Sequence, residues 1–354
     1  MSRQETQRPA RLVDVAVRAG VSVGTASKAL NGHGGLRSET RARVLAAAEE
    51  LGFLPNALAR GLLRGRSFTV GLIASDAVGR FSIPVMLGVE DALSAGRIAV
   101  LFCDGRGDPI REEHYLRSLL ARRVDGIIVA GGQTDPRPPI GSGLTVPVVY
   151  AWTPSTDPMD ASVVPDHEGG AYAAVAHLLG VGRQRVGHVS GPQQFRSVEL
   201  RAKGVFRALA EAGLQLAGPG PLYGDWSEAW GRQAAAILLR SCPELDAVSC
   251  GNDEIARGVA DGLRDLGLRV PDDVAIIGFD NWEIMSAHAR VPLSTVDMSL
   301  HEVGRVAAGR LLQAINGAAV HGTQYLPCQL VLRESTGLQA RSGRPPGPVA
   351  RPSP

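Results

Sequence analysis

Beyond about residue 66, the chain alternates between short apolar runs and stretches long enough to form helices. Apolar runs of this length, separated by helix-length segments, are typical of strands buried on both faces of a parallel sheet. We therefore predict an α/β body of two lobes built on parallel sheets. The predicted strands are TVGLIASD (69–76), IAVLFCDG (98–105), GIIVAGG (126–132), PVVYAW (147–152), RVGHVSG (185–191), AVSCGND (247–253) and VAIIGFDN (274–281).

A polar residue ends several of the apolar runs. These residues are Asp76, Asp104, Asp166, Asn252 and Asp280. In open α/β sheets, ligands bind just beyond the carboxyl ends of the strands. Each of these residues taken alone is also a good helix cap, which is the alternative. Their recurrence at the same position of successive runs predicts a polar ligand cleft.

The first 66 residues differ in charge from the rest. They carry 11 Lys and Arg against 5 Asp and Glu, a net charge of +6, within a chain whose total is +2. The remainder is therefore mildly acidic. A small basic segment attached to a larger acidic body is typical of a module that binds a polyanion, although a solvated basic tail is the alternative.

The basic segment has the spacing of a helix-turn-helix. We predict helices over 13–19, over 22–31 and from Ser38 to Leu51, with Gly20 supplying a tight turn. Ala26 and Ala29 face inward, so the outer face of the second helix is free to enter a major groove. Predicted base contacts are Val23, Gly24 and Lys28; predicted phosphate contacts are Ser22, Thr25, Ser27 and Asn31. An ordinary helical hairpin with a polar face is the alternative.

Residues 53–66, FLPNALARGLLRGR, predict a helix of about two turns, too short to be stable alone. Such a segment can fold when docked on DNA, with Leu62 wedged into the minor groove and Arg60 and Arg64 on phosphates. A plain linker is the alternative, but it does not account for the leucines.

These features together resemble the LacI/GalR family of lactose-repressor-like transcription regulators. The resemblance covers about residues 11–338 and rests on several separate motifs. They are DVAVRAGVSVGTASKALNG, SETRARVLAAAEELGFLPNALARGLLRGRS, VGLIASD, VPDHEGG, HVSGP, SVELRAKG, GDWS, GNDEIARG, DDVAIIGFDN, PLSTVDM and LVLRESTG. Lys28 and Gly61 depart from the residues common there, so the operator sequence does not follow from the resemblance.

The resemblance implies a domain order. It comprises a disordered arm (1–10), a helix-turn-helix domain (11–54), a hinge helix or linker (55–66), an effector-binding and dimerisation domain (67–338) and a disordered tail (339–354). Lobe one would span about 67–166 plus 296–326, and lobe two about 167–295 plus 327–338. In this family the hinge meets the minor groove, which assigns Ala59 and Leu62 to that contact.

The resemblance also implies an effector cleft between the lobes, similar to that of periplasmic sugar-binding proteins. The positions that would line it are Arg201, Asp225, Trp226, Asn252 and Asp280, with Ser75, Phe81, Trp152 and Leu300 as further candidates. Carboxylates, an amide, a guanidinium and an aromatic face suit a polyol. The effector is therefore expected to be a sugar, with a nucleobase or nucleoside corepressor as the alternative.

Other function classes explain less of the chain. A dehydrogenase would need the full G-x-G-x-x-G fingerprint, and the eight histidines lack metal-ligand spacing, so we expect no enzyme activity, cofactor or metal. A sugar-binding protein without DNA regulation leaves the basic segment unexplained. The expectation is a cytoplasmic homodimer, usually a repressor in this family, that binds a pseudo-palindromic double-stranded DNA operator and no membrane.

Overall fold

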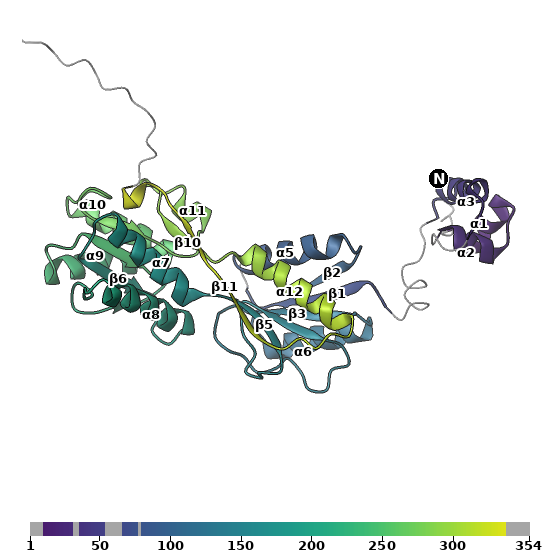
Figure 1. The fold of residues 1–354 in the computed structure, drawn as a ribbon, viewed down its shortest axis with the longest axis horizontal. Helices are drawn as coiled ribbons and strands as arrows, with labels where there is room; N and C mark the ends of the chain where they lie inside the picture. The colour runs from purple at the N-terminus through teal and green to yellow at the C-terminus, as the bar shows by residue number, and fades with distance from the viewer. Residues whose placement is uncertain (1–9, 31–34, 54–65, 77–78, 338–354) are drawn as a thin grey trace, which may run out of the picture. The chain divides into compact units, whose positions relative to one another are not determined.

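A computed structural model describes residues 10–30, 35–53, 66–76 and 79–337 (Figure 1). The chain divides into two compact units, Met1–Phe68 and Thr69–Pro354, called here the head and the body. The predicted contact residues Asn31, Ala59 and Leu62 lie outside the described residues, as do residues 1–9 of the predicted arm, residues 55–65 of the predicted hinge and the predicted tail.

The head is a small bundle of helices around a core of alanine and valine. Its helices are α1 (Leu12–Ala19), α2 (Val23–Leu30) and α3 (Ser38–Glu50). Gly20 ends α1 with a φ of 63°, a left-handed conformation that glycine adopts without strain. The side chain of Ser22 then caps α2 by accepting a hydrogen bond from the Thr25 N–H at 3.1 Å. Because Ala16 and Ala26 are buried and small, the helices can pack closely.

Lobe one of the body contains a six-stranded parallel sheet in the order β11-β5-β4-β3-β1-β2. The strands are β1 (Thr69–Ala74), β2 (Ala99–Asp104), β3 (Gly126–Ala130), β4 (Val148–Ala151), β5 (Ala161–Pro165) and β11 (Gly322–Leu326). Its helices are α5 (Ser82–Ser94), α6 (Pro109–Ala121) and α12 (Leu300–Ile315). Leu72 and Ile128 pack with α5 and α12, whereas Ile73 and Ile127 pack with α6 on the opposite face.

Lobe two contains a four-stranded parallel sheet in the order β7-β6-β8-β9. The strands are β6 (Val186–Ser190), β7 (Leu222–Tyr223), β8 (Ala247–Cys250) and β9 (Ala275–Ile277). Its helices are α7 (His167–Gly180), α8 (Arg196–Glu211), α9 (Glu228–Ser241), α10 (Asp253–Asp265) and the short α11 (Glu283–Ser286). An antiparallel pair, β10 (Thr295–Asp297) and β12 (Gln329–Val331), lies where the chain passes between the lobes.

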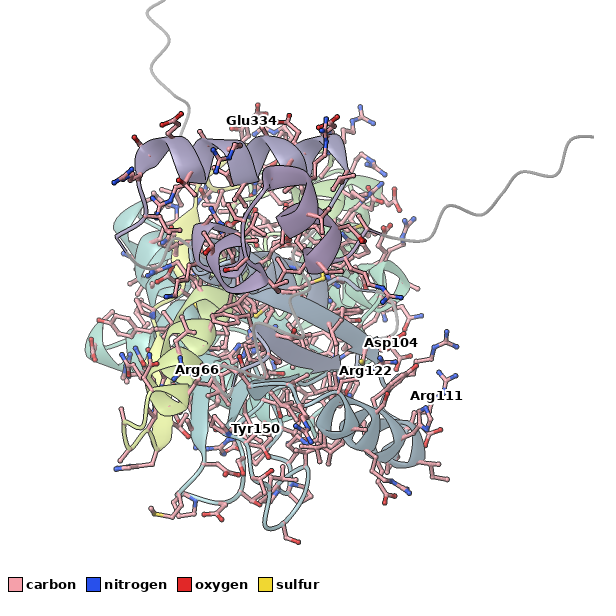
Figure 2. The ribbon with its side chains drawn as sticks, turned by 90° about the vertical axis from the view of Figure 1, so that its right-hand side faces the viewer. Arg66, Asp104, Arg111, Arg122, Tyr150 and Glu334 are labelled. Atoms are coloured by element: carbon pink, nitrogen blue, oxygen red, sulfur yellow. The ribbon has the colours of Figure 1, made fainter. Side chains whose placement is uncertain are left out.

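The predicted fold class is confirmed: all the predicted strands form, and both large sheets are parallel. The apolar pattern missed β5, although every residue of that strand is buried, and it missed strands that are short or polar. β7 has two residues, and β11 places Thr323, Gln324 and Tyr325 at the exposed edge of its sheet. On the outside of lobe one, Arg111 and Arg122 project from α6 and the residue after it (Figure 2).

Helices α5 and α12 of lobe one cross at a pair of glycines. A Cβ at Gly88 would overlap the carbonyl oxygen of His301, and one at Gly304 would overlap that of Val85. The two backbones can approach this closely only because neither position has a side chain. This contact fixes the position of α5, whose first turn lies beside the cleft described below.

We predict that Gly88→Ala lowers the free energy of unfolding of the body by about 1–3 kcal/mol, because the added methyl overpacks the α5–α12 crossing. Gly309→Ala in the same helix pair is the control, since no atom lies within 4 Å of its Cβ position. The Gly309→Ala variant should have a free energy of unfolding up to about 1 kcal/mol higher, because alanine has a higher helix propensity than glycine. Urea unfolding followed by circular dichroism measures both, and equal effects of the two variants would contradict the packing argument.

Candidate functional site

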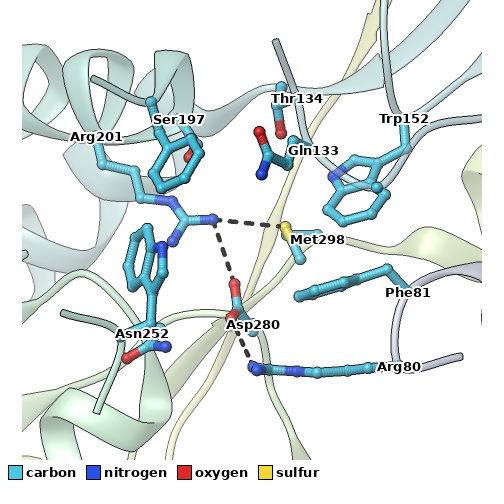
Figure 3. A pocket seen from close by; sticks show the side chains of 13 residues that line it. Arg80, Phe81, Gln133, Thr134, Trp152, Ser197, Arg201, Asn252, Asp280 and Met298 are labelled. Carbon is cyan, nitrogen blue, oxygen red and sulfur yellow. Dashed lines mark hydrogen bonds and ion pairs between the residues drawn. The ribbon is translucent and has the colours of Figure 1, made fainter. Parts of the chain in front are cut away.

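A cavity of about 230 Å³ lies between the two lobes of the body (Figure 3). Both walls are built from residues that follow the carboxyl ends of strands. Lobe one contributes Arg80, Phe81, Gly132, Gln133, Thr134 and Trp152. Lobe two contributes Phe195, Ser197, Arg201, Trp226, Asn252 and Asp280, and Met298 lies on a segment that crosses between the lobes. We call this cavity the main cavity.

Arg201 of α8 lies at the centre of the lobe-two wall and is 5% exposed. Its guanidinium donates hydrogen bonds to Nδ1 of His167, to the carbonyl of Gly251 and, at 3.2 Å, to Oδ1 of Asp280. Its carbon Cζ also lies 3.8 Å from the ring centroid of Phe279, within cation–π range. A buried cation needs such partners, because desolvation otherwise costs several kcal/mol.

The protonation of His167 follows from these contacts. Because Arg201 donates to Nδ1, that nitrogen must be an acceptor, and Nε2 then carries the proton and donates to Thr134 Oγ1 at 2.9 Å. Burial, reinforced by the charge of Arg201, lowers the pKa of His167 well below its usual range. A neutral imidazole therefore links Arg201 in lobe two to Thr134 in lobe one.

Asp280, just after β9, is held by two arginines from different lobes. Arg201 binds Oδ1, and Arg80 from the start of lobe one binds Oδ2 at 2.6 Å. Arg80 also lies 3.7 Å from the carboxylate of Glu254. Burial raises the pKa of Asp280, although both guanidiniums oppose this shift. The Asp280 backbone adopts a φ of 100°, a conformation that most residues avoid and that aims its carboxylate into the cavity.

Two aromatic pairs form opposite walls of the main cavity. In lobe one the ring centroids of Phe81 and Trp152 are 4.3 Å apart, and in lobe two those of Phe195 and Trp226 are 6.3 Å apart. The indole Nε1 of Trp152 is buried and has no hydrogen-bond partner among the described residues. The cavity therefore combines flat apolar faces with polar groups at its centre, the arrangement that small-molecule sites commonly have.

A second contact joins the lobes at another part of the cleft. Asp135 of lobe one accepts a hydrogen bond from the backbone N–H of Arg196, the first residue of α8, at 3.0 Å. No side chain of lobe two caps that helix at its N-cap residue, Phe195. The carboxylate from one lobe thus satisfies a helix terminus of the other, and this contact can form only when the lobes are close.

Most of the predicted effector residues lie together. The structure places Phe81, Trp152, Arg201, Trp226, Asn252 and Asp280 in the cavity lining. Three others lie outside it. Asp225 is exposed, Ser75 donates to Glu112 at 2.7 Å, and Leu300 is buried at the start of α12.

The expectation that all the strand-end polar residues face the cleft is wrong for Asp76, Asp104 and Asp166. Asp76 accepts from the N–H groups of Phe81 and Ser82 and so caps α5. Asp166 accepts from Gly169 N–H and caps α7, and Asp104 closes a turn by accepting from Arg106 N–H. The capping alternative describes Asp76 and Asp166, because free N–H groups at a helix start lie closer to them than the cavity does, whereas Asp104 stabilises a turn.

Several lining residues were not predicted. They are Arg80, Gln133, Thr134, Phe195, Ser197 and Met298. Gln133 and Thr134 directly follow a predicted strand, so the strand-end rule applied a few residues further would have found them. Arg80 and Met298 carry no such signal, because only the packing of the lobes brings them to the cavity.

In the head, the outer face of α2 is the candidate nucleic-acid interface. Ser22, Val23, Gly24 and Lys28 are exposed, while Thr25 and Ser27 are half-buried. Ala26 and Ala29 face inward against α1 and α3. One face of α2, with both polar and apolar residues, is thus open to solvent. In helix-turn-helix proteins the second helix is the one that enters the major groove.

A helix-turn-helix head joined to a two-lobed α/β body with a ligand-sized cavity defines the class of ligand-responsive DNA-binding regulators. Comparisons with known proteins agree with this class. Residues 11–56 match the family described as "Bacterial regulatory proteins, lacI family", and residues 175–336 match the "Periplasmic binding protein-like domain".

Whole-chain relatives are regulators as well. Catabolite control protein A of Priestia megaterium is 34% identical over 92% of this chain and 98% of its own length. The transcriptional regulator CelR of Thermobifida fusca is 32% identical over 94% of this chain and 99% of its own length. The solved structure of the lac repressor dimer bound to operator and the anti-inducer ONPF matches with a TM-score of 0.75 and 28% sequence identity. The match covers 93% of this chain and 99% of the lac repressor chain.

The chain belongs to the LacI family of transcriptional regulators. Its relatives regulate transcription and are not enzymes. Within residues 10–30, 35–53, 66–76 and 79–337, no helix combines the length and apolar character needed to cross a bilayer. The same residues contain no group of three or more His, Cys, Asp or Glu placed to hold a metal ion.

The buried carboxyl of Asp253, behind the main cavity, makes the stability of lobe two depend on pH. Asp253 starts α10, accepts from Thr295 Oγ1 at 2.5 Å and from Trp282 N–H at 2.7 Å, and is fully buried. Burial, and then the charge of Asp280, raise its pKa to about 8. At neutral pH the carboxyl therefore holds its proton in the folded protein but loses it on unfolding.

We predict that the unfolding free energy of the wild type falls, relative to Asp253→Asn, as pH rises from about 5 to 8. Because the folded pKa exceeds the unfolded one, the folded state binds more protons in this window, and the slope is at most about 1.4 kcal/mol per pH unit. Asparagine does not titrate, so it removes this dependence. Urea unfolding at several pH values measures it, and parallel profiles for the two proteins would contradict a raised pKa.

Proposed function

We propose that the chain is a repressor that binds operator DNA through α2 and is controlled by a sugar in the main cavity. The observation that carries the sugar assignment is the main cavity itself. Aromatic pairs from both lobes flank a central Arg201–Asp280 pair. Sugar rings present apolar C–H faces to aromatic rings and hydroxyls to carboxylates, amides and guanidiniums.

The polar groups around this pair favour a neutral polyol. Asn252 uses its Oδ1 to cap α10, which leaves its amide N–H groups for a ligand. The carboxylate of Asp280, which lines the main cavity, can accept from hydroxyls. A structure of the relative CelR carries cellobiose, matching this chain with a TM-score of 0.64 and 30% identity, which supports the assignment.

A nucleobase or nucleoside is the second candidate. The two flat aromatic pairs could stack on a planar ring, and Asn252 could pair with a base edge. Such a ligand would act as a corepressor if it strengthened DNA binding. The two candidates differ in the groups that the cavity must satisfy: several hydroxyls for a sugar, and one ring edge for a base.

Ligand and operator would be coupled through the lobes. Arg80 and Asp135 of lobe one bind Asp280, Glu254 and the start of α8 in lobe two. A ligand between these contacts changes the free energy of lobe closure by its differential affinity for the two forms. By linkage, an inducing ligand and the operator weaken each other's binding by the same factor.

On the DNA side, Val23, Gly24 and Lys28 would meet base edges, with Ser22, Thr25, Ser27 and Asn31 at phosphates. Ala59 and Leu62 would enter the minor groove from the hinge. A homodimer would then read a pseudo-palindromic operator in the cytoplasm. The exposed face of α2 and the net charge of +6 on residues 1–66 support this part of the proposal.

We predict that Lys28→Ala weakens operator binding by about 5- to 150-fold, because a base contact from a long cation is worth about 1–3 kcal/mol. Arg240→Ala, an equal loss of charge on α9, should have no effect. Mobility shifts on the gene's own upstream DNA, repeated at several salt concentrations, measure both variants. If Arg240→Ala weakens binding as much as Lys28→Ala, net charge rather than α2 would be responsible.

We predict that Arg201→Lys abolishes the response to ligand while leaving operator affinity within about threefold of wild type, because lysine keeps the charge but loses the planar fork. The assay titrates a panel of sugars and nucleosides into the protein–operator complex and follows the intrinsic fluorescence of the free protein. A sugar that releases DNA supports the proposal. Binding of nucleosides alone would replace the sugar with the second candidate.

A further inference from the structure

A second cavity adjoins the main cavity and has no role in the function proposed above. Its volume is about 400 Å³, and it shares Phe195 with the main cavity. Lobe one contributes Asp135 and Pro136, and lobe two contributes Gln193, Gln194 and Tyr223, among others. We call it the outer cavity.

The main cavity is small for a ligand-binding site. Its volume of about 230 Å³ falls below the roughly 300–1,000 Å³ of sites that hold drug-sized molecules. It therefore suits a single ring. A ligand with a second ring must extend beyond the main cavity. Because Phe195 lines both cavities, the second ring would extend past Phe195 into the outer cavity.

The outer cavity has the same combination of faces and polar groups. Phe195 and Tyr223 supply aromatic surface, and the exposed amides of Gln193 and Gln194 can both donate and accept. Asp135 uses Oδ1 to bind the Arg196 N–H, while its Oδ2 is buried and accepts no hydrogen bond from the described residues. A buried carboxylate oxygen without a donor is rare in proteins. This oxygen has no surface open to the outer cavity, so the polar groups that a ligand meets there are the amides of Gln193 and Gln194.

The charges around this cavity favour a neutral ligand. Arg196 and Lys203 both bind the carboxylate of Glu199, at 2.5 and 2.7 Å. Glu199 and Asp135 together carry two negative charges, which balance the two positive charges of Arg196 and Lys203. The carboxylate of Asp135 would repel a phosphate or a sugar acid, so a phosphorylated ring is disfavoured and a hydroxylated one fits.

We propose that the two cavities are adjoining subsites for one disaccharide, with one ring in the main cavity and the other in the outer cavity. This inference rests on the proposed sugar effector. It adds that the sugar has two rings and is neutral. The ring in the main cavity lies between the aromatic pairs beside Arg201. The second ring packs on Phe195 and Tyr223 and forms hydrogen bonds with the amides of Gln193 and Gln194.

The test compares each monosaccharide with its disaccharide on the full-length protein by calorimetry. The probes are glucose with cellobiose, xylose with xylobiose, mannose with mannobiose and galactose with lactose. For the sugar that binds, the disaccharide should bind at least about tenfold more tightly, because its second ring adds hydrogen bonds and apolar contact.

Two variants locate the second ring. The double variant Gln193→Ala, Gln194→Ala should remove most of the disaccharide's advantage, about tenfold, and leave monosaccharide affinity unchanged. Gln184→Ala is the matched control, because this glutamine is exposed on lobe two and lies outside both cavities. It should change neither affinity.

The outcomes separate the two levels of the proposal. Equal affinity for monosaccharide and disaccharide, or an equal loss of both in the double variant, overturns the two-ring assignment while a sugar effector stands. If no probe of either length binds at millimolar concentration while a nucleoside does, the sugar assignment itself fails, and the two-ring assignment with it.

Discussion

The buried guanidinium of Arg201 is the contact on which the cleft depends. It belongs to α8, yet its partners come from the start of α7, the loop after β8, the loop after β9 and a segment that crosses between the lobes. A buried cation is tolerated only if each donor finds a partner. Arg201 therefore fixes the relative positions of these segments, and with them the tautomer of His167 and the direction of the Asp280 carboxylate.

The strand-end residues show how one position serves two purposes. Parallel strands place their carboxyl ends and the following helix starts at one edge of a sheet, so a polar residue there meets both free N–H groups and any ligand. Asn252 does both, since it caps α10 through Oδ1 and still lines the cavity. Asp76 and Asp166 cap their helices and do not reach it. The sequence pattern is identical in each case, so only the packing of the opposite lobe distinguishes them.

The lobes meet through charges that a ligand would have to accommodate. Arg80 and Asp135 each reach from lobe one to groups in lobe two, and the main cavity shares residues or neighbours with both contacts. Interlobe bonds of this kind form only when the two lobes lie close together. They give the body a small number of discrete contacts through which an occupied cleft can differ in energy from an empty one. Such an energy difference is the physical requirement for ligand control of DNA binding.

The order of the apolar runs, the glycine turn after α1 and the charge of the head were enough to predict the parallel sheets and the helix-turn-helix, because these are local patterns of burial and backbone conformation. The family was predicted from the resemblance of several sequence motifs. Arg201, Asn252, Asp280 and Trp226 were also identified from motifs of the chain. The sequence could not predict Arg80, Phe195 or Met298 in the cavity, or Asp225 outside it. Their positions depend on how two lobes, each crossed more than once by the chain, pack against each other, and a contact between residues two hundred positions apart leaves no periodic signal in either segment.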